Sequence, residues 1–161
     1  MCGPIANENQ MQPLSLPPYP AKTSVQDGRT MIFDDLRQRY VRLTPEEWVR
    51  QHFIHYLIGQ KGYPAALLAN EISIKVGNMD RRCDSVLFHR DGGRPRIIME
   101  YKAPHVSITQ KVFQQIYAYN SALRADYLFV SNGMQHYGCH IDYEKMEVTF
   151  LKEIPDFGEL M

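Results

Sequence analysis

Two acids and a lysine, Asp84, Glu100 and Lys102, lie on the two sides of a short predicted β-hairpin. Two apolar runs flank Asp91-Gly92-Gly93, and Asp-Gly or Gly-Gly between such runs is a strong hairpin signal. If the loop is odd in length and centred on Gly92, Asp84 lies directly opposite Glu100. Opposed residues share a face, with Cα atoms roughly 4.5–5.5 Å apart. Lys102 follows Glu100 on that face, about 7 Å along the strand.

Two like charges held on one face of a sheet repel each other and need a compensating partner. We expect a divalent cation, because carboxylate oxygens are its usual protein ligands. The alternative is ordinary surface charge, with Glu100 paired internally to Lys102 or Arg82. The surrounding strands are apolar on both faces, where an unpaired charge is costly. That placement favours a functional site.

The N-terminal residues 1–30 hold five of the ten prolines and show little apolar periodicity. We interpret them as an extended, proline-rich arm. Residues 31–161 are predicted to form a single domain, in which residues 31–33 and 40–43 are short strands. At 161 residues the chain is long enough for one substantial hydrophobic core.

The rest of the chain alternates between helical and strand-like segments. A helix is predicted from Thr44-Pro45, where Glu47 closes a capping box, to an end marked by Gly62. A second helix is predicted over about 109–124, and strands at 71–76, 82–89, 96–102, 127–130, 135–141 and 146–151. The hairpin strands carry apolar residues on both faces, Val86 and Ile98 on one, Leu87 and Ile97 on the other. These patterns predict an α/β fold, a three-layer α-β-α sandwich around a mixed central sheet.

This order of elements, with Asp84 on the second strand and Glu100-Tyr101-Lys102 ending the third, resembles the PD-(D/E)XK nuclease superfamily. Gln115 and Tyr119 on the next helix resemble the QxxxY element of its RecB-like and type I restriction branches. The phrases LTPEEWVRQHFIHYL, MEYKAP, FQQIYAYN and VSNGMQHY resemble the N-terminal nuclease domain of type I restriction enzyme R subunits. The resemblance covers most of residues 30–155. It implies a restriction-endonuclease-like fold and hydrolysis of DNA phosphodiester bonds.

The resemblance also implies a role for each residue of the predicted site. Asp84 and Glu100 would be ligands of Mg²⁺, for which Mn²⁺ can substitute, and the Tyr101 backbone carbonyl would be a third oxygen ligand. Such a cation polarises the phosphate and generates a nucleophile at neutral pH. Lys102 would act as the catalytic lysine, beside the water and the negative charge of the transition state.

Four further residues complete the candidate set. Gln115 and Tyr119 lie one helical turn apart, and could brace Lys102 or contact the DNA backbone. Their alternative is a packing role at the helix edge. Glu47 and Glu71 are additional candidate metal ligands, since family members sometimes use a carboxylate on the first helix. Glu47 has the simpler alternative of being only the capping-box residue.

The chain departs from the family pattern in two respects. Cys83 stands where the superfamily name has a proline, a position without a chemical role. No GxxxxGK[ST] phosphate loop occurs, so we expect no helicase motor of the R-subunit type within this chain. We therefore expect a stand-alone relative of the R-subunit nuclease domain, without translocation-coupled cleavage.

Charge and cysteine content restrict the setting. The chain has 18 basic and 18 acidic residues, but residues 72–111 hold eight basic residues against four acids, a local excess that suits a phosphate-binding face. Scattered solvated charge is the alternative. Three cysteines without paired spacing argue against a disulfide framework. No apolar run is long enough to cross a bilayer and no signal peptide is evident, so we expect a cytoplasmic protein without membrane contact.

These observations lead to three hypotheses. The first is a Mg²⁺-dependent DNA endonuclease of a restriction-modification system. Because one site cuts one strand, it would act on duplexes as a homodimer or with a partner subunit. The second is a catalytically silent nuclease-like module that binds DNA or serves assembly. The third is a structural subunit whose acids are paired internally.

Overall fold

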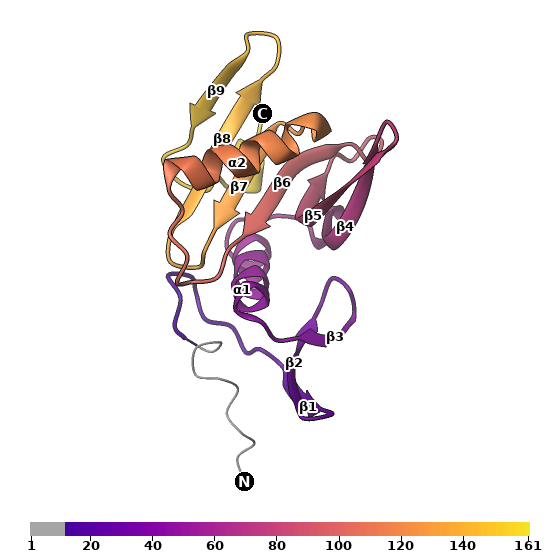
Figure 1. The fold of residues 1–161 in the computed structure, drawn as a ribbon, viewed down its shortest axis with the longest axis vertical. Coiled ribbons are helices and arrows are strands. Elements are labelled where there is room, and N and C mark those ends of the chain that lie inside the picture. Colours follow the sequence, from indigo (N-terminus) through magenta and orange to yellow (C-terminus); the bar gives the residue numbers. More distant parts are fainter. Residues whose placement is uncertain (1–11) are drawn as a thin grey trace.

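The computed structural model describes residues 12–161, which form a large sheet, two helices and a smaller separate sheet (Figure 1). The predicted arm is described only from residue 12 onward; its residues 1–11 lie outside the described residues. The helices are α1 (Pro45–Gly59) and α2 (Gln110–Asn120). The strands are β1 (Thr23–Gln26), β2 (Arg29–Asp34), β3 (Arg39–Arg42), β4 (Leu68–Val76), β5 (Met79–Phe88), β6 (Pro95–Tyr101), β7 (Tyr127–Ser131), β8 (His136–Asp142) and β9 (Glu147–Phe150). Short 3-10 helices lie at Ala65–Leu67, Ser121–Leu123 and Phe157–Glu159.

The large sheet has six strands in the order β4-β5-β6-β7-β8-β9. Only β6 and β7 run parallel, and α2 connects them; every other neighbouring pair in this sheet is antiparallel. A parallel pair needs a crossover connection of this kind, whereas antiparallel neighbours need only short turns. The sheet is therefore mixed, as the sequence predicts.

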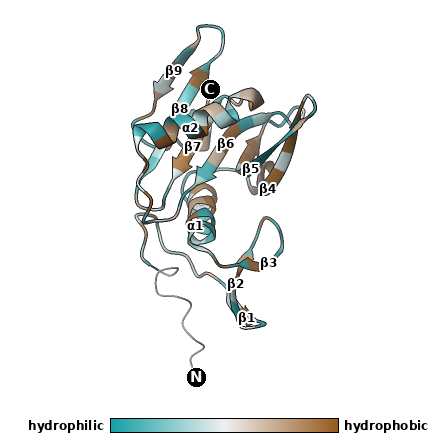
Figure 2. Cartoon of the chain, viewed as in Figure 1, coloured by the Kyte–Doolittle hydropathy of each residue, from teal (hydrophilic) through white to brown (hydrophobic). Residues whose placement is uncertain are grey.

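The two faces of this sheet are covered by separate hydrophobic cores. On one face, Val49 and Phe53 of α1 share a core with Leu87 and Ile97. On the other, α2 contributes Phe113 and Ile116 to a core that contains Val86 and Ile98. Figure 2 shows the hydrophobic stretches along the central strands between these layers. The predicted three-layer α-β-α sandwich, a restriction-endonuclease-like fold, is confirmed.

The smaller sheet, in the order β1-β2-β3, lies beside α1 and apart from the six-stranded sheet (Figure 1). Its strand β1 falls inside the segment predicted as an extended arm, because Asp27-Gly28 forms a tight turn that pairs β1 with β2. Asp27 and Gly28 have φ angles of 51° and 75°, and the left-handed region suits a two-residue hairpin turn. The same Asp-Gly signal that indicates the later hairpin is therefore present here too.

The helix boundaries follow local capping chemistry. The Thr44 side chain accepts a hydrogen bond from the Glu47 backbone N–H at 3.0 Å, and Pro45 opens α1, as predicted. At the other end, Gly62 has a φ of 75° and the Tyr63 N–H returns to the Leu57 carbonyl at 3.0 Å. The helix itself ends three residues before the predicted glycine, at Gly59. No helix within residues 12–161 is long and apolar enough to cross a membrane.

Candidate functional site

The β5–β6 hairpin has the register that the sequence predicts for the site. Ser85 pairs with Met99 and Val86 with Ile98, so the next step along the strands sets Asp84 against Glu100. Near the loop the prediction of an odd, centred turn is wrong, because a bulge between Leu87 and Phe88 shifts the pairing by one residue. The His89 N–H then bonds to the Arg94 carbonyl at 2.8 Å. The bulge lies outside the site and leaves the facing of the two acids unchanged.

Asp84 is fixed at the end of this hairpin by the main chain of the neighbouring strand. Its Oδ2 accepts a hydrogen bond from the Tyr101 N–H at 2.9 Å. The Asp84 backbone carbonyl accepts a second bond, from Arg50 Nη1 of α1, at 2.6 Å. Asp84 is therefore held by β6 through its side chain and by α1 through its main chain.

Glu100 lies beside Asp84 in a poorly solvated position. Burial and the neighbouring Asp84 carboxyl raise the pKa of Glu100 to about 9, while Asn120 and Lys102 act in the opposite direction. Asn120 Nδ2 reaches Glu100 Oε1 at 3.5 Å from the last turn of α2. No ion pair involves Asp84 or Glu100 anywhere in residues 12–161, and Arg82 pairs with Glu71 instead. The pairing of Glu100 with Lys102 or Arg82, considered from the sequence, is therefore absent among residues 12–161.

Lys102 follows β6 directly and faces the same cleft. Its N–H bonds to the Ser131 carbonyl at 2.9 Å, which extends the β6–β7 pairing by one residue. The cleft has a volume of about 460 Å³ and is lined by residues from α1, β4, β5 and β6: Thr44, Glu46, Arg50, Glu71, Asp84, Glu100, Tyr101 and Lys102. Asp84, Glu100 and Lys102, predicted from the hairpin spacing and from the family resemblance, therefore line one cavity.

The two additional candidate ligands are neutralised by arginines. Glu71 lines the cleft, but its carboxylate pairs with Arg50 at 2.9 Å and Arg82 at 2.7 Å. Glu47 is buried, pairs with Arg50 and Arg37 at 2.8 Å each, and does not line the cleft. Burial alone would raise the pKa of both carboxyls, but these hydrogen bonds and charges lower it. Both acids are thus already supplied with positive charge.

The α2 residues Gln115 and Tyr119 do not line the cleft with Lys102; contact with the DNA backbone, the other role predicted for them, stays a prediction. Both residues are exposed. The Arg81 guanidinium stacks over the Tyr119 ring, 4.6 Å from the ring centre. Asn120, the next residue, is the one that contacts Glu100. Sequence reasoning missed both Asn120 and Arg50. A charge at position 50, between the apolar residues Val49 and Phe53, was the available signal.

The donor set fits a hard divalent cation better than a softer one. Within residues 12–161 no three His, Cys, Asp or Glu side chains are arranged to hold a metal ion. Structural zinc sites need four such ligands. Mg²⁺ needs only one or two carboxylates, because it keeps several waters. Two adjacent unpaired carboxylates, with Tyr101 on the same cavity, meet that lower requirement.

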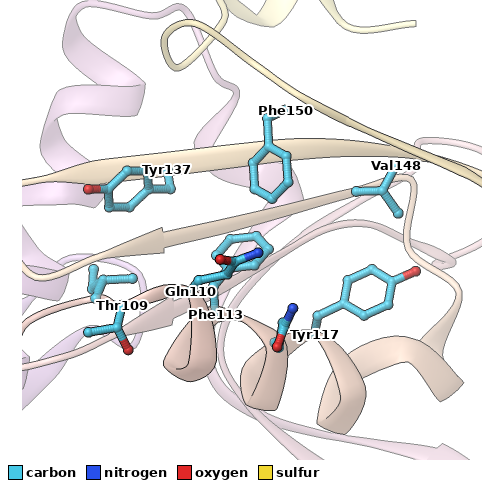
Figure 3. Close-up of a pocket in the computed structure, with 9 residues that line it drawn as sticks. Thr109, Gln110, Phe113, Tyr117, Tyr137, Val148 and Phe150 are labelled. Atoms are coloured by element: carbon cyan, nitrogen blue, oxygen red, sulfur yellow. The ribbon is translucent and has the colours of Figure 1, made fainter.

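A larger cavity, of about 640 Å³, lies between α2 and the β8–β9 hairpin, away from these residues (Figure 3). Aromatic side chains surround it, among them Phe113, Tyr117, Tyr137 and Phe150. None of its lining residues is a carboxylate, a lysine or an arginine. Its larger size does not make it the better candidate for a metal site, because it offers no carboxylate ligand.

The fold and the cleft together define a restriction-endonuclease-like α/β protein with two adjacent carboxyl groups and a lysine on neighbouring interior strands of its sheet. The chain belongs to the family described as type I restriction enzyme R protein N terminus (HSDR_N), whose profile matches residues 45–155. No curated protein is similar enough to give a match.

Among solved structures, the chain is similar to a fragment assigned to an HsdR subunit of a type I restriction enzyme from Vibrio vulnificus YJ016. The TM-score is 0.50 at 20% sequence identity. The match covers 71% of this chain and 24% of that chain, so this chain corresponds to about a quarter of its relative. At that identity the likeness supports the fold alone.

Proposed function

We propose that this protein is a Mg²⁺-dependent DNA endonuclease in which Asp84 and Glu100 bind the cation and Lys102 assists hydrolysis. The observation that carries the proposal is the convergence of these three side chains on one open cleft, with the two carboxyls adjacent and neither in an ion pair within residues 12–161. Membership in a restriction-enzyme family supports DNA as the substrate.

Each of the predicted site residues has a distinct part in this proposal. Asp84 and Glu100 would hold the cation, with the Tyr101 carbonyl as a third oxygen. Bound there, Mg²⁺ supplies Lewis-acid activation of the scissile phosphate and of water, with Mn²⁺ as a substitute. The Lys102 ammonium, on the same cleft, would stabilise the negative charge that develops on the phosphate oxygens. Gln115 and Tyr119 would act from outside the cleft, on the DNA backbone.

Cleavage of duplex and single-stranded DNA in Mg²⁺ or Mn²⁺ tests the proposal. We expect Glu100→Ala and Lys102→Ala each to lower the cleavage rate by about 10²-fold or more, because each removes a group that acts on the reacting charge. Glu147→Ala and Lys145→Ala are matched controls on the exposed β8–β9 hairpin and should cleave like wild type. Equal residual activity in wild type and the two site variants would end the assignment.

Cutting both strands of a duplex requires more than one site of this kind. We therefore propose that the protein acts as a homodimer or with a partner subunit of a restriction system. The family relation supports a restriction-system partner. The excess of basic over acidic residues between 72 and 111 supports a DNA-facing surface on this part of the chain.

One observation favours a second function, a nuclease-like module that binds DNA or serves assembly without turnover. Gln115 and Tyr119, the QxxxY residues, stand outside the cleft. This function predicts salt-dependent DNA binding that is unchanged in Glu100→Ala, and no cleavage in either metal. Metal-dependent turnover by the wild type excludes it.

A further inference from the structure

The strand pairing next to Asp84 is interrupted at one position. β4 and β5 pair at Asn70 with Ser85 and at Ile72 with Cys83, but the residues between, Glu71 and Asp84, are not a paired couple. Glu71 has a φ of 51°, a left-handed conformation that costs free energy for a residue other than glycine. Some contact outside the sheet must hold the chain in this arrangement.

Arg50 provides that contact from helix α1, which lies outside the sheet. Its Nη1 donates to the Asp84 carbonyl at 2.6 Å, and its Nη2 donates to Glu71 Oε1 at 2.9 Å. One guanidinium therefore binds both residues of the interrupted pair, one through its main chain and one through its side chain.

Arg50 is itself rigidly placed. Its Nε and Nη2 bind the two oxygens of Glu47 at 2.9 and 2.8 Å, a two-point arrangement within the same helix. The side chain is 8% exposed, and its guanidinium lies 6.0 Å from the centre of the Tyr101 ring. Such a side chain has little freedom to move, so it transmits the position of α1 to the Asp84 main chain.

We propose that Arg50 is a positioning residue that fixes the Asp84 carboxylate for metal binding, by holding the Asp84 carbonyl at the break in the β4–β5 pairing. This inference rests on the proposed function, since it assumes that Asp84 binds the cation. The carboxylate carbon of Asp84 is two bonds from the Cα that carries this carbonyl, so a shift of the peptide moves the carboxylate against Glu100.

A lysine cannot replace this arginine. One ammonium group cannot bind the Asp84 carbonyl, both Glu47 oxygens and Glu71 in the geometry that the planar guanidinium provides. Arg50→Lys keeps the charge that Glu47 needs but loses the simultaneous contacts. Loss of such a supporting contact typically weakens metal binding 10- to 100-fold, roughly, in known sites.

The matched control is Arg37→Lys. Arg37 binds the same Glu47 oxygen at 2.8 Å and is also largely buried, but it contacts Asp34 rather than Asp84. If Arg50 matters only because it neutralises Glu47, the two lysine variants should behave alike. If it positions Asp84, only Arg50→Lys should change metal binding.

The experiment is a calorimetric titration of the full chain with Mn²⁺, with no DNA present. We expect Arg50→Lys to weaken Mn²⁺ binding about 10-fold or more, and Arg37→Lys to bind like wild type. Unchanged binding in Arg50→Lys, or equal losses in both variants, overturns the inference. Arg50→Gln, whose amide still donates one hydrogen bond, replaces the lysine variant if circular dichroism shows that the latter is unfolded, and the same loss is expected.

Asp84→Asn separates this inference from the function on which it rests. If the wild type binds Mn²⁺ and Asp84→Asn does not, the metal site stands and the arginine variants decide the role of Arg50. If wild type and Asp84→Asn bind Mn²⁺ equally, or neither binds, the metal site and the inference both fail.

Discussion

At the scale of single residues, the acids around the cleft differ in how their charge is balanced. Glu47 and Glu71 each bind two arginines, which lower their pKa values. Asp84 and Glu100 have no such partner within residues 12–161, and the pKa of Glu100 is raised. Arginines therefore neutralise Glu47 and Glu71 but not the two acids of the proposed site. This difference is consistent with a carboxyl pair kept available for a cation, and such a pair lowers the stability of the fold when no cation is bound.

That cost should appear as a pH dependence of the free energy of unfolding, measured with a chelator that removes divalent cations. Glu100 has a raised pKa of about 9 in the folded protein, against an ordinary value of 4.5. Between these values the folded state keeps a proton that the unfolded state releases, so the free energy of unfolding falls as pH rises. The slope should reach up to about 1.4 kcal/mol per pH unit.

Urea unfolding of wild type and Glu100→Gln at pH 6 and pH 8, with EDTA, measures this contribution. The glutamine cannot ionise, so the variant should lose less stability between the two pH values than wild type does. The other titrating groups are common to both proteins and cancel in the comparison. Parallel pH profiles would show that Glu100 is ordinarily ionised in the folded protein.

The sequence was sufficient to bring the three proposed site residues together, because strand alternation sets the register on the site side of the hairpin bulge. Asp84, Glu100 and Lys102 follow from the register of a single hairpin. Arg50 and Asn120 could not be found that way, since their contacts to Asp84 and Glu100 cross 34 and 20 residues of sequence and depend on how each helix is rotated over the sheet. Helical spacing indicates an apolar face but not which polar residue at its edge will meet a strand.

At the scale of elements, the turns decide where strand-based reasoning succeeds. The β5–β6 loop was expected to be symmetric about Gly92. A bulge beyond Leu87 instead shifts the pairing by one residue on the loop side, while the pairing on the site side keeps the predicted register. Bulges depend on local backbone preferences, which the alternation of apolar and polar residues along a strand does not reveal. The Asp27-Gly28 turn was missed because the prolines around it dominated the interpretation of the arm.

The turn between β7 and β8 is where the N-terminal segment attaches. Ser15 N–H bonds to the Gly133 carbonyl at 2.8 Å, and Gly133 has a φ of 84°. A Cβ at this position would lie 2.7 Å from Leu14 Cδ2 and 3.1 Å from Val49 Cγ2. Both the backbone conformation and the close approach therefore require glycine.

Gly133→Ala should lower the free energy of unfolding by about 2 kcal/mol, through backbone strain and crowding against Leu14. Gly158→Ala is the matched control, because an added methyl group there would meet nothing within 4 Å and the φ of Gly158 is not left-handed. That variant should unfold like wild type. Chemical denaturation of the three proteins decides between a local requirement at Gly133 and a general intolerance of alanine.

At the scale of the whole molecule, a buried chain of hydrogen bonds joins the small sheet to the site. Asn70 Nδ2 donates to Asp34 Oδ2 at 3.0 Å, the Ser85 hydroxyl donates to Asn70 Oδ1 at 2.6 Å, and the Tyr101 hydroxyl donates to Ser85 Oγ at 2.9 Å. The chain runs from β2 through β4 and β5 to β6. The β1–β3 sheet is thereby connected to the strands that carry Asp84 and Glu100, although it shares no strand with them.

Asp34 is the residue on which this connection depends. It is 0% exposed, and its carboxylate also binds Arg37 and the Leu36 N–H. Asp34→Ala leaves the Asn70 amide and the Arg37 guanidinium without their partner, so we expect a loss of roughly 3 kcal/mol or more in the free energy of unfolding. Limited proteolysis should also cut faster between residues 12 and 43. Asp35→Ala, next to it but exposed and paired with His55 at the surface, should cost less than about 1 kcal/mol. Equal effects of the two variants would mean that the small sheet is held by its hydrophobic contacts with α1 and not by this buried carboxylate.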